Sequence, residues 1–244
     1  MFFISGRMET ALPKIVHQIW IGKGIRPDPW MRSVRDFCKE HEYTYMLWTD
    51  SNLGALDFDV VPGLRALFKG QERGEAAASS QGKSDIIRLL ALYKYGGVYI
   101  DADTVIMKPG MFATFIEKNT APVFFGWENK EQSLIANGLI GAVPKHAFIL
   151  TLLEGLVPNA KKEKGEAAWK QVGPLFVTRV YQEMKDWFPD VHIYPMKYFY
   201  PIHWVGIKDP EHHKKVKIPE ESMLFQYGYT TNGFDKHFWE QKNM

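Results

Sequence analysis

The chain has 244 residues, of which 45% are hydrophobic and 24% charged, enough for one large domain with a full core or at most two small ones. A formal net charge of +2 argues against a nucleic-acid partner, because nucleic-acid-binding proteins concentrate Lys and Arg on one face. Cys38 is the sole cysteine, which excludes an intrachain disulfide.

The N-terminal stretch "MFFISGR" carries too short an apolar run for a targeting or membrane segment. A signal peptide needs about 7–15 apolar residues and a membrane span about 20. We therefore expect no membrane span and a cytoplasmic protein, with peripheral membrane association left open. No repeat or compositional break divides the chain, so residues 1–244 are expected to form a single domain.

Strand and helix patterns alternate through the first third of the chain. Residues 14–22, "KIVHQIWIG", predict a buried strand, in which His17 is expected to be a hydrogen-bonded core histidine. A helix is predicted over 28–41, a second strand over 43–48 and two helical stretches over about 62–81. This alternation is typical of an α/β domain with a mostly parallel sheet.

The strongest local pattern begins with "SDIIRLLALYKYGG". Ser84 is predicted to cap a helix that stops at Gly96, and the double glycine turns the chain into a strand over 98–103. Further strands are expected over 122–128 and 138–143.

The last third is less regular. "GPLFVTRVYQEMKDWF" (173–188) predicts a helix, and the segment from 189 onwards shows no clean period and could drape over the sheet edge.

Four charged residues should meet where this strand returns beside the start of the helix. Asp85 and Arg88 share one helix face, and Asp101 and Asp103 share one strand face. Two carboxylates this close repel unless a cation intervenes, and Mg²⁺ or Mn²⁺ commonly bridges such acids to substrate phosphates. The pattern predicts a metal–diphosphate site at the carboxyl edge of the sheet.

Other interpretations of the motif remain open at this point. "DADT" could simply cap a strand with solvated acids. "DADTV" also fits the nucleophile motif of haloacid-dehalogenase-like phosphatases, although no later acidic cluster accompanies it. "AASSQGKS" (77–84) fits only the loosest phosphate-loop pattern, and no apolar strand precedes it.

With these residues assembled, the sequence resembles the glycosyltransferases of family 32 and is distantly similar to the clostridial glucosylating toxins. The resemblance rests on five blocks in the family's order: "LPKIVHQIWIG", "YMLWTD", "SDIIRLLALYKYGGVYIDADTVI", "NGLIGAVPKHAF" and "VGPLFVT". It implies a GT-A fold, a Rossmann-like nucleotide-binding mixed sheet flanked by helices, whose D-x-D motif holds a donor diphosphate through Mn²⁺ or Mg²⁺.

The resemblance also implies roles for residues along the donor. Asp103 would ligate the metal, and Asp101 would support it while contacting the ribose and sugar. Tyr99 would line the nucleoside pocket together with Ile19 and Trp20, and Trp20 matches the tryptophan that stacks on uracil in the toxins.

Around the transferred sugar, the resemblance implies that Asp85, Arg88 and Asn137 make the contacts, with Arg88 also facing the developing phosphate charge. Near the C-terminus the sequence departs from the family, because "QYGYTTNGFDKHFW" (226–239) has no Ser-Trp. Asn232 could supply an oxygen to the metal, and Phe234 could replace the tryptophan.

The sequence thus predicts a metal-dependent, retaining glycosyltransferase. It is expected to move a hexose from a nucleotide diphosphate sugar, with a UDP-sugar favoured over GDP-mannose, to a glycan or other hydroxyl acceptor. The alternative is a degenerate sugar-nucleotide or glycan-binding module that has kept the fold and lost turnover.

Overall fold

The computed structural model describes residues 11–71, 76–207 and 209–234. The N-terminal apolar run and residues 235–239 of the closing segment lie outside these ranges. Within them, none of the helices combines the length and apolarity needed to cross a membrane.

A six-stranded mixed sheet forms the centre of the fold, in the order β2-β1-β3-β6-β5-β7. The strands are β1 (Ile15–Ile19), β2 (Thr44–Trp48), β3 (Gly97–Ile100), β5 (Val123–Trp127), β6 (Ile135–Ala142) and β7 (Val191–Tyr194). Strand β6 runs antiparallel to both β3 and β5, and the other pairs are parallel. The expected α/β class with a mixed GT-A-type sheet is confirmed.

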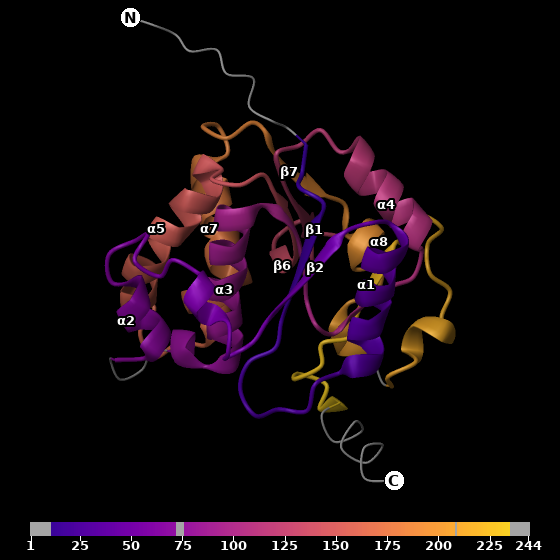
Figure 1. Cartoon of the computed structure of the whole chain (residues 1–244), viewed down its shortest axis with the longest axis horizontal. Helices are drawn as coiled ribbons and strands as arrows, with labels where there is room; N and C mark the ends of the chain where they lie inside the picture. The colour runs from indigo at the N-terminus through magenta and orange to yellow at the C-terminus, as the bar shows by residue number, and fades with distance from the viewer. Residues whose placement is uncertain (1–10, 72–75, 208, 235–244) are drawn as a thin grey trace, which may run out of the picture.

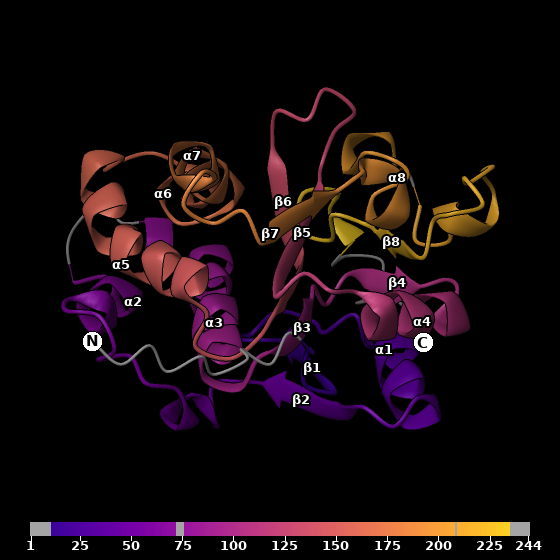
Figure 2. The same cartoon turned by 90° about the horizontal axis from the view of Figure 1, so that it is seen from above.

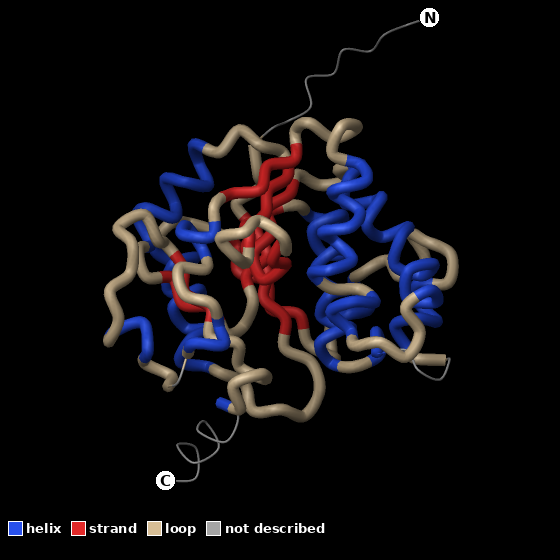
Figure 3. Tube along the Cα trace, turned by 180° about the vertical axis from the view of Figure 1, so that it is seen from behind, coloured by secondary structure: helices blue, strands red, loops and turns tan. Residues whose placement is uncertain are grey.

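Helices cover both faces of this sheet (Figure 1). On one side lie α2 (Leu64–Lys69), α3 (Ser80–Tyr95), α5 (Ala147–Lys162), α6 (Ala168–Gln171) and α7 (Pro174–Met184). On the other lie α1 (Asp28–Glu40), α4 (Pro109–Lys118) and α8 (Met196–Phe199), beside a small sheet of β4 (Thr104–Ile106) and β8 (Leu224–Gln226) (Figure 2). Seen from behind, the strands stand between the two helical layers (Figure 3).

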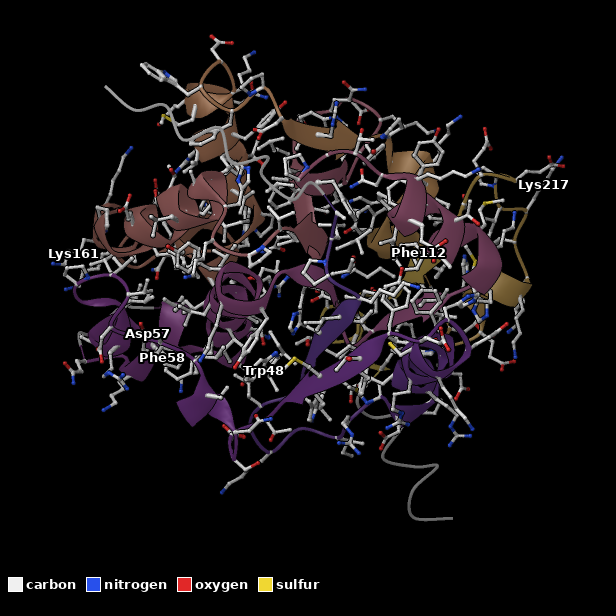
Figure 4. The ribbon with its side chains drawn as sticks, turned by 45° about the horizontal axis from the view of Figure 1, so that its top comes forward. Trp48, Asp57, Phe58, Phe112, Lys161 and Lys217 are labelled. Atoms are coloured by element: carbon white, nitrogen blue, oxygen red, sulfur yellow. The ribbon has the colours of Figure 1, made fainter. Side chains whose placement is uncertain are left out.

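Each face of the sheet packs against its own apolar cluster, which is why the strands are hydrophobic on both sides. One cluster joins Trp48 and Phe58 to α3 and α5, and the other joins Phe112 to α1 and α8. Phe58 and Phe112 lie on opposite sides of the molecule in Figure 4. Four short 3₁₀ turns, η1 (Leu53–Ala55), η2 (Ala76–Ala78), η3 (Trp204–Gly206) and η4 (His212–Lys214), complete the described elements.

The predicted core histidine is found as expected. Trp48 Nε1–H donates to His17 Nδ1 over 3.2 Å, so the proton of the neutral ring lies on Nε2, which donates to the carbonyl of Gly96 over 2.8 Å. Burial lowers the pKa of His17 to about 4, against a weaker opposing effect of the Gly96 hydrogen bond. His17 is therefore a neutral structural link between β1, β2 and the end of α3.

Two local predictions need correction. Helix α3 begins at Ser80 rather than Ser84, because the Ser79 side chain caps it by accepting from Gly82 N–H, and the Ser84 hydroxyl donates to the Ser80 carbonyl inside the helix. The loose phosphate-loop segment is therefore η2 and the start of this helix, with α2 rather than a strand before it in the described residues.

The other differences lie further along the chain. Strand β3 ends at Ile100, so the two acids lie in the turn that follows it rather than on one strand face. The tail after 189 is more regular than expected, since it supplies the edge strand β7 and also β8.

Candidate active site

A pocket of about 510 Å³ opens at the edge of the sheet where β1, β3 and β5 end. Strands β1 and β3 are parallel, and antiparallel β6 begins at the same edge, so side chains from three strands converge there. Eight of the nine predicted site residues line the pocket: Ile19, Trp20, Asp85, Arg88, Tyr99, Asp101, Asp103 and Asn137.

The double glycine makes this convergence possible. Gly96 and Gly97 have φ angles of 63° and 94°, which residues other than glycine rarely adopt. A Cβ on Gly97 would lie 2.3 Å from the carbonyl oxygen of Ile15, so only glycine lets the chain leave α3 and pair at once with β1. This return brings the turn after β3 back beside the first turns of α3.

Arg88 lies at the centre of the charged residues and is only 5% exposed. Its Nη2 lies 3.2 Å from Asp85 Oδ1 and 3.3 Å from Asp101 Oδ1. The guanidinium carbon is 4.5 Å from the centre of the Tyr99 ring, and Nη1 donates to the backbone carbonyl of Asn137. Burial by itself lowers the pKa of Arg88, but the neighbouring charges, led by Asp101, raise it above its ordinary value. The guanidinium therefore stays charged.

Asp85 is buried against the start of β6. Its Oδ1 accepts from Asn137 Nδ2 over 2.8 Å, and burial raises the pKa of this carboxyl to about 7 against the opposing charge of Arg88. A Cβ on Gly173 would lie 2.9 Å from Asp85 Oδ2, which explains the glycine in "VGPLFVT". Asp85 and Asn137 thus form one hydrogen-bonded unit held by Arg88.

Asp101 and Asp103 face each other across the side chain of Gln226. Gln226 Nε2 donates to Asp101 Oδ2 over 2.7 Å and reaches Asp103 Oδ1 at 3.4 Å, while Tyr229 N–H donates to Asp103 Oδ2 over 2.7 Å. Tyr99 O–H donates to the other oxygen of Asp101 over 2.5 Å. Gln226 therefore ties together the two acids of the D-x-D motif.

The charge on Asp103 is not balanced by a cationic side chain. In the described parts of the chain no Lys, Arg or His pairs with it, and burial, followed by the charge of Asp101, raises its pKa to about 6. The same parts contain no group of three or more His, Cys, Asp or Glu side chains that could hold a metal. Two carboxylates with one unbalanced charge fit a hard divalent cation whose remaining ligands come from water and substrate phosphates.

The far end of the pocket is aromatic. Trp20 and Tyr229 meet edge to face with ring centroids 5.7 Å apart. Trp20 Nε1 donates to the carbonyl of Gly24, and the Tyr229 hydroxyl donates to the carbonyl of Ile25. These bonds hold both rings in place beside the pocket, as a stacking site for a planar base requires.

Asn232 does not line the pocket, unlike the other predicted residues. Its side-chain nitrogen donates to the backbone carbonyl of Tyr227 over 2.7 Å. Phe234 packs edge to face on Trp30, at a centroid distance of 5.8 Å. Gln226, rather than Asn232, is the amide side chain that touches the D-x-D acids.

The pocket residues to which the sequence interpretation gave no role include Gln226, Tyr229 and Glu128. Gln226 lies opposite Thr104 in the β4–β8 pair, which brings it to the D-x-D turn from more than 120 residues away. Glu128 directly follows β5. The one available signal was an acid at the end of a predicted strand, and it applied to Glu128.

Comparisons with known proteins match the part of the chain that contains the D-x-D motif. The family model described as "Glycosyltransferase sugar-binding region containing DXD motif" matches residues 27–121. An inositol phosphoceramide mannosyltransferase of Schizosaccharomyces pombe is 28% identical over 196 residues, which is 77% of this chain and 50% of that protein. A mannosyl phosphorylinositol ceramide synthase of Saccharomyces cerevisiae is 28% identical over 182 residues, 72% of this chain and 44% of that protein. The chain thus spans about half the length of these relatives.

Solved structures show the same fold. A glycosyltransferase involved in the glycosylation of the major capsid of PBCV-1 superposes with a TM-score of 0.54 and 16% identity, covering 92% of this chain and 100% of that chain. The PaToxG glycosyltransferase gives a TM-score of 0.52 and 19% identity, covering 71% and 70%. The predicted resemblance is confirmed: residues 27–121 match the DXD-containing sugar-binding region of glycosyltransferases, and the chain has the GT-A fold of solved glycosyltransferases.

Proposed function

We propose that this chain is a metal-dependent, retaining glycosyltransferase that moves a hexose from a nucleotide diphosphate sugar to a hydroxyl acceptor. The observation that carries the proposal is the buried Arg88, which holds Asp85 and Asp101 within 3.3 Å beside the unbalanced charge of Asp103. Such a network orients a sugar and stabilises negative charge on a departing diphosphate.

The donor is proposed to lie along the edge of the sheet. Trp20 and Tyr229 contact the base, and the D-x-D turn meets the diphosphate. Asp85 and Asn137 hydrogen-bond the hydroxyls of the transferred hexose. Asp101 and Asp103 would hold Mn²⁺ or Mg²⁺, which when bound would supply positive charge next to the diphosphate. Retention of the anomeric configuration rests on the family resemblance, and no nucleophile is assigned.

Two considerations bear on the donor. The aromatic pair of Trp20 and Tyr229 supports the UDP-sugar favoured by the sequence. The names of the fungal relatives, a mannosyltransferase and a mannosyl phosphorylinositol ceramide synthase, support mannose as the sugar. A UDP-hexose and GDP-mannose are therefore the two donors to compare first.

The acceptor is proposed to present a hydroxyl on a sugar or inositol ring. The two fungal relatives are named for inositol phosphoceramide and for mannosyl phosphorylinositol ceramide. A Mus musculus relative, 26% identical over 66% of this chain, is named a lactosylceramide 4-alpha-galactosyltransferase. These names have in common a polyhydroxylated headgroup.

The test is nucleotide release from UDP-glucose, UDP-galactose and GDP-mannose with Mn²⁺, alongside calorimetric titration of each donor. We expect Mn²⁺-dependent binding and slow hydrolysis of one donor. Binding of a donor without release of its nucleotide would favour the degenerate sugar-nucleotide-binding module. If none of the three donors bound, the transferase and the binding module would both be refuted.

A further inference from the structure

One polar side chain of β1, that of Gln18, is fully buried beside the D-x-D turn. Gln18 lies two residues from Val16, so the two side chains point to the same face of the sheet, and Val16 belongs to the apolar cluster on that face. A primary amide in apolar surroundings is costly unless both of its ends are hydrogen-bonded. The partners of Gln18 therefore show what this amide does.

Both ends of the amide have a partner. Gln18 Nε2 donates to the backbone carbonyl of Asp101 over 3.2 Å, and Oε1 accepts from the Tyr45 hydroxyl over 2.8 Å. Burial raises the pKa of Tyr45 to about 12, so this hydroxyl keeps its proton. Turning the amide around would set its oxygen against the Asp101 carbonyl, which has no proton to donate. The amide therefore has one orientation.

The bond from Gln18 takes the place of a bond between strand backbones. The register of β1 with β3 ends at His17 and Tyr99, before the chain reaches Asp101. The N–H of Asp101 still donates to the Gly138 carbonyl of β6 over 2.8 Å. Its carbonyl accepts from the side chain of Gln18. The first acid of the motif is thus held by its backbone from both neighbouring strands.

The same carbonyl closes the turn that carries the second acid. Thr104 N–H donates to the Asp101 carbonyl over 3.1 Å, with Asp103 inside the turn. The orientation of this peptide group sets the direction in which the chain leaves Asp101, and so the spacing of the two carboxylates. A hard cation such as Mg²⁺ demands near-ideal ligand geometry, so this spacing bears on how tightly the turn binds metal.

We propose that Gln18 is a positioning residue of the metal site, which sets the spacing of the Asp101 and Asp103 carboxylates through the Asp101 carbonyl. Tyr45 holds the amide in the orientation that this requires. The inference rests on the proposed metal-dependent function. Gln18 is not among the residues that line the pocket, so it acts through the turn and not by contact with the donor.

The test uses Mn²⁺ alone as the probe, with free Mn²⁺ measured by electron paramagnetic resonance. The proteins are the wild type, Gln18→Met, Tyr45→Phe and the double variant, and urea denaturation gives the stability of each. Methionine has nearly the length of glutamine and lacks its hydrogen-bonding groups.

Gln171→Met is the matched control. Gln171 is also fully buried, donates to the backbone carbonyls of Glu163 and Glu166, and is not among the residues that line the pocket. Its replacement removes a buried amide of the same kind that has no bond to the D-x-D turn.

Gln18→Met is expected to weaken Mn²⁺ binding by about 10-fold, as loss of a group that orients metal ligands does. Tyr45→Phe should cause a smaller loss, because the amide keeps its bond to Asp101 but loses the partner that orients it. The double variant should equal Gln18→Met, since the hydroxyl acts through the amide. Gln171→Met should lose stability and keep the wild-type affinity for Mn²⁺.

Equal Mn²⁺ affinities of Gln18→Met and Gln171→Met would overturn the inference and leave the proposed function standing. If Gln18→Met did not fold, Tyr45→Phe would decide, and an unchanged affinity in that half-buried variant would count against the inference. Losses that simply added in the double variant would remove Tyr45 from it. A wild type that bound no Mn²⁺ would refute the inference and the proposed metal dependence together.

Discussion

Replacing Asp103 with Asn should make the metal-free protein more stable while removing its metal-dependent function. Asp103 and Asp101 share the Gln226 amide, and Asp103 has no cationic partner among the described residues. Asn has nearly the same shape and can still accept from Tyr229 N–H, so the substitution removes a charge without leaving a gap. Stability is gained because the cost of burying the Asp103 charge disappears, together with its repulsion by Asp101.

The magnitude follows from the pKa of Asp103, which burial and the charge of Asp101 raise from 3.8 to about 6. A rise of about two units corresponds to about 3 kcal/mol, and partial exposure of Asp103 to the pocket reduces the expected gain to about 1–2 kcal/mol. Because the folded-state pKa is raised, the contribution of this group to stability is present below pH 4 and is lost as the pH rises through 6. The advantage of Asp103→Asn should therefore be full at pH 7 and small near pH 4.

Urea denaturation in chelator at pH 7 and pH 4.5 measures this difference, with Asp36→Asn, an exposed acid of α1, as control. Adding Mn²⁺ should stabilise the wild type and the control but not Asp103→Asn. Calorimetry should show metal-dependent donor binding in the first two proteins alone. If Asp103→Asn were less stable than the wild type at pH 7, or equally stabilised by Mn²⁺, the reasoning about this carboxylate pair would be wrong.

Three further predictions concern single residues. Arg88→Met should lower the free energy of unfolding, measured with urea, by about 3–5 kcal/mol and abolish donor hydrolysis, because Asp85 and Asp101 lose their buried partner. A loss of stability below about 1 kcal/mol would argue against the network. Gly138→Ala places a Cβ 2.7 Å from Asp101 Oδ2, so donor hydrolysis should fall, with a stability loss of about 1–3 kcal/mol. In the control, Gly110→Ala, the added Cβ meets no atom within 4 Å, and hydrolysis should stay intact. For His17, whose pKa is lowered to about 4, the stabilising contribution is present above pH 6.5 and lost as the pH falls to 4. Between those pH values the free energy of unfolding of the wild type should therefore fall by about 3 kcal/mol more than that of His17→Gln. Equal losses in denaturation curves would contradict a neutral His17 in the folded protein.

The core of the site could be predicted because it is local in sequence. Asp85, Arg88 and the D-x-D acids lie within 19 positions of one another, joined by one helix, two glycines and one strand. Helical periodicity and the positive φ of the double glycine are properties of short peptides, so they can be read from the chain alone. The strand boundary was less certain, since β3 ends only where its neighbours stop pairing, at Ile100.

The tertiary structure decided which distant residues complete the pocket. Gln226 reaches the acids only because β8 pairs with β4, and Glu128 only because β5 is placed beside β6. Strand partners are chosen by packing across the whole core, which no short pattern encodes. For the same reason Asn232, an equally plausible amide in the sequence, lies on the Tyr227 carbonyl while Gln226 holds the two acids.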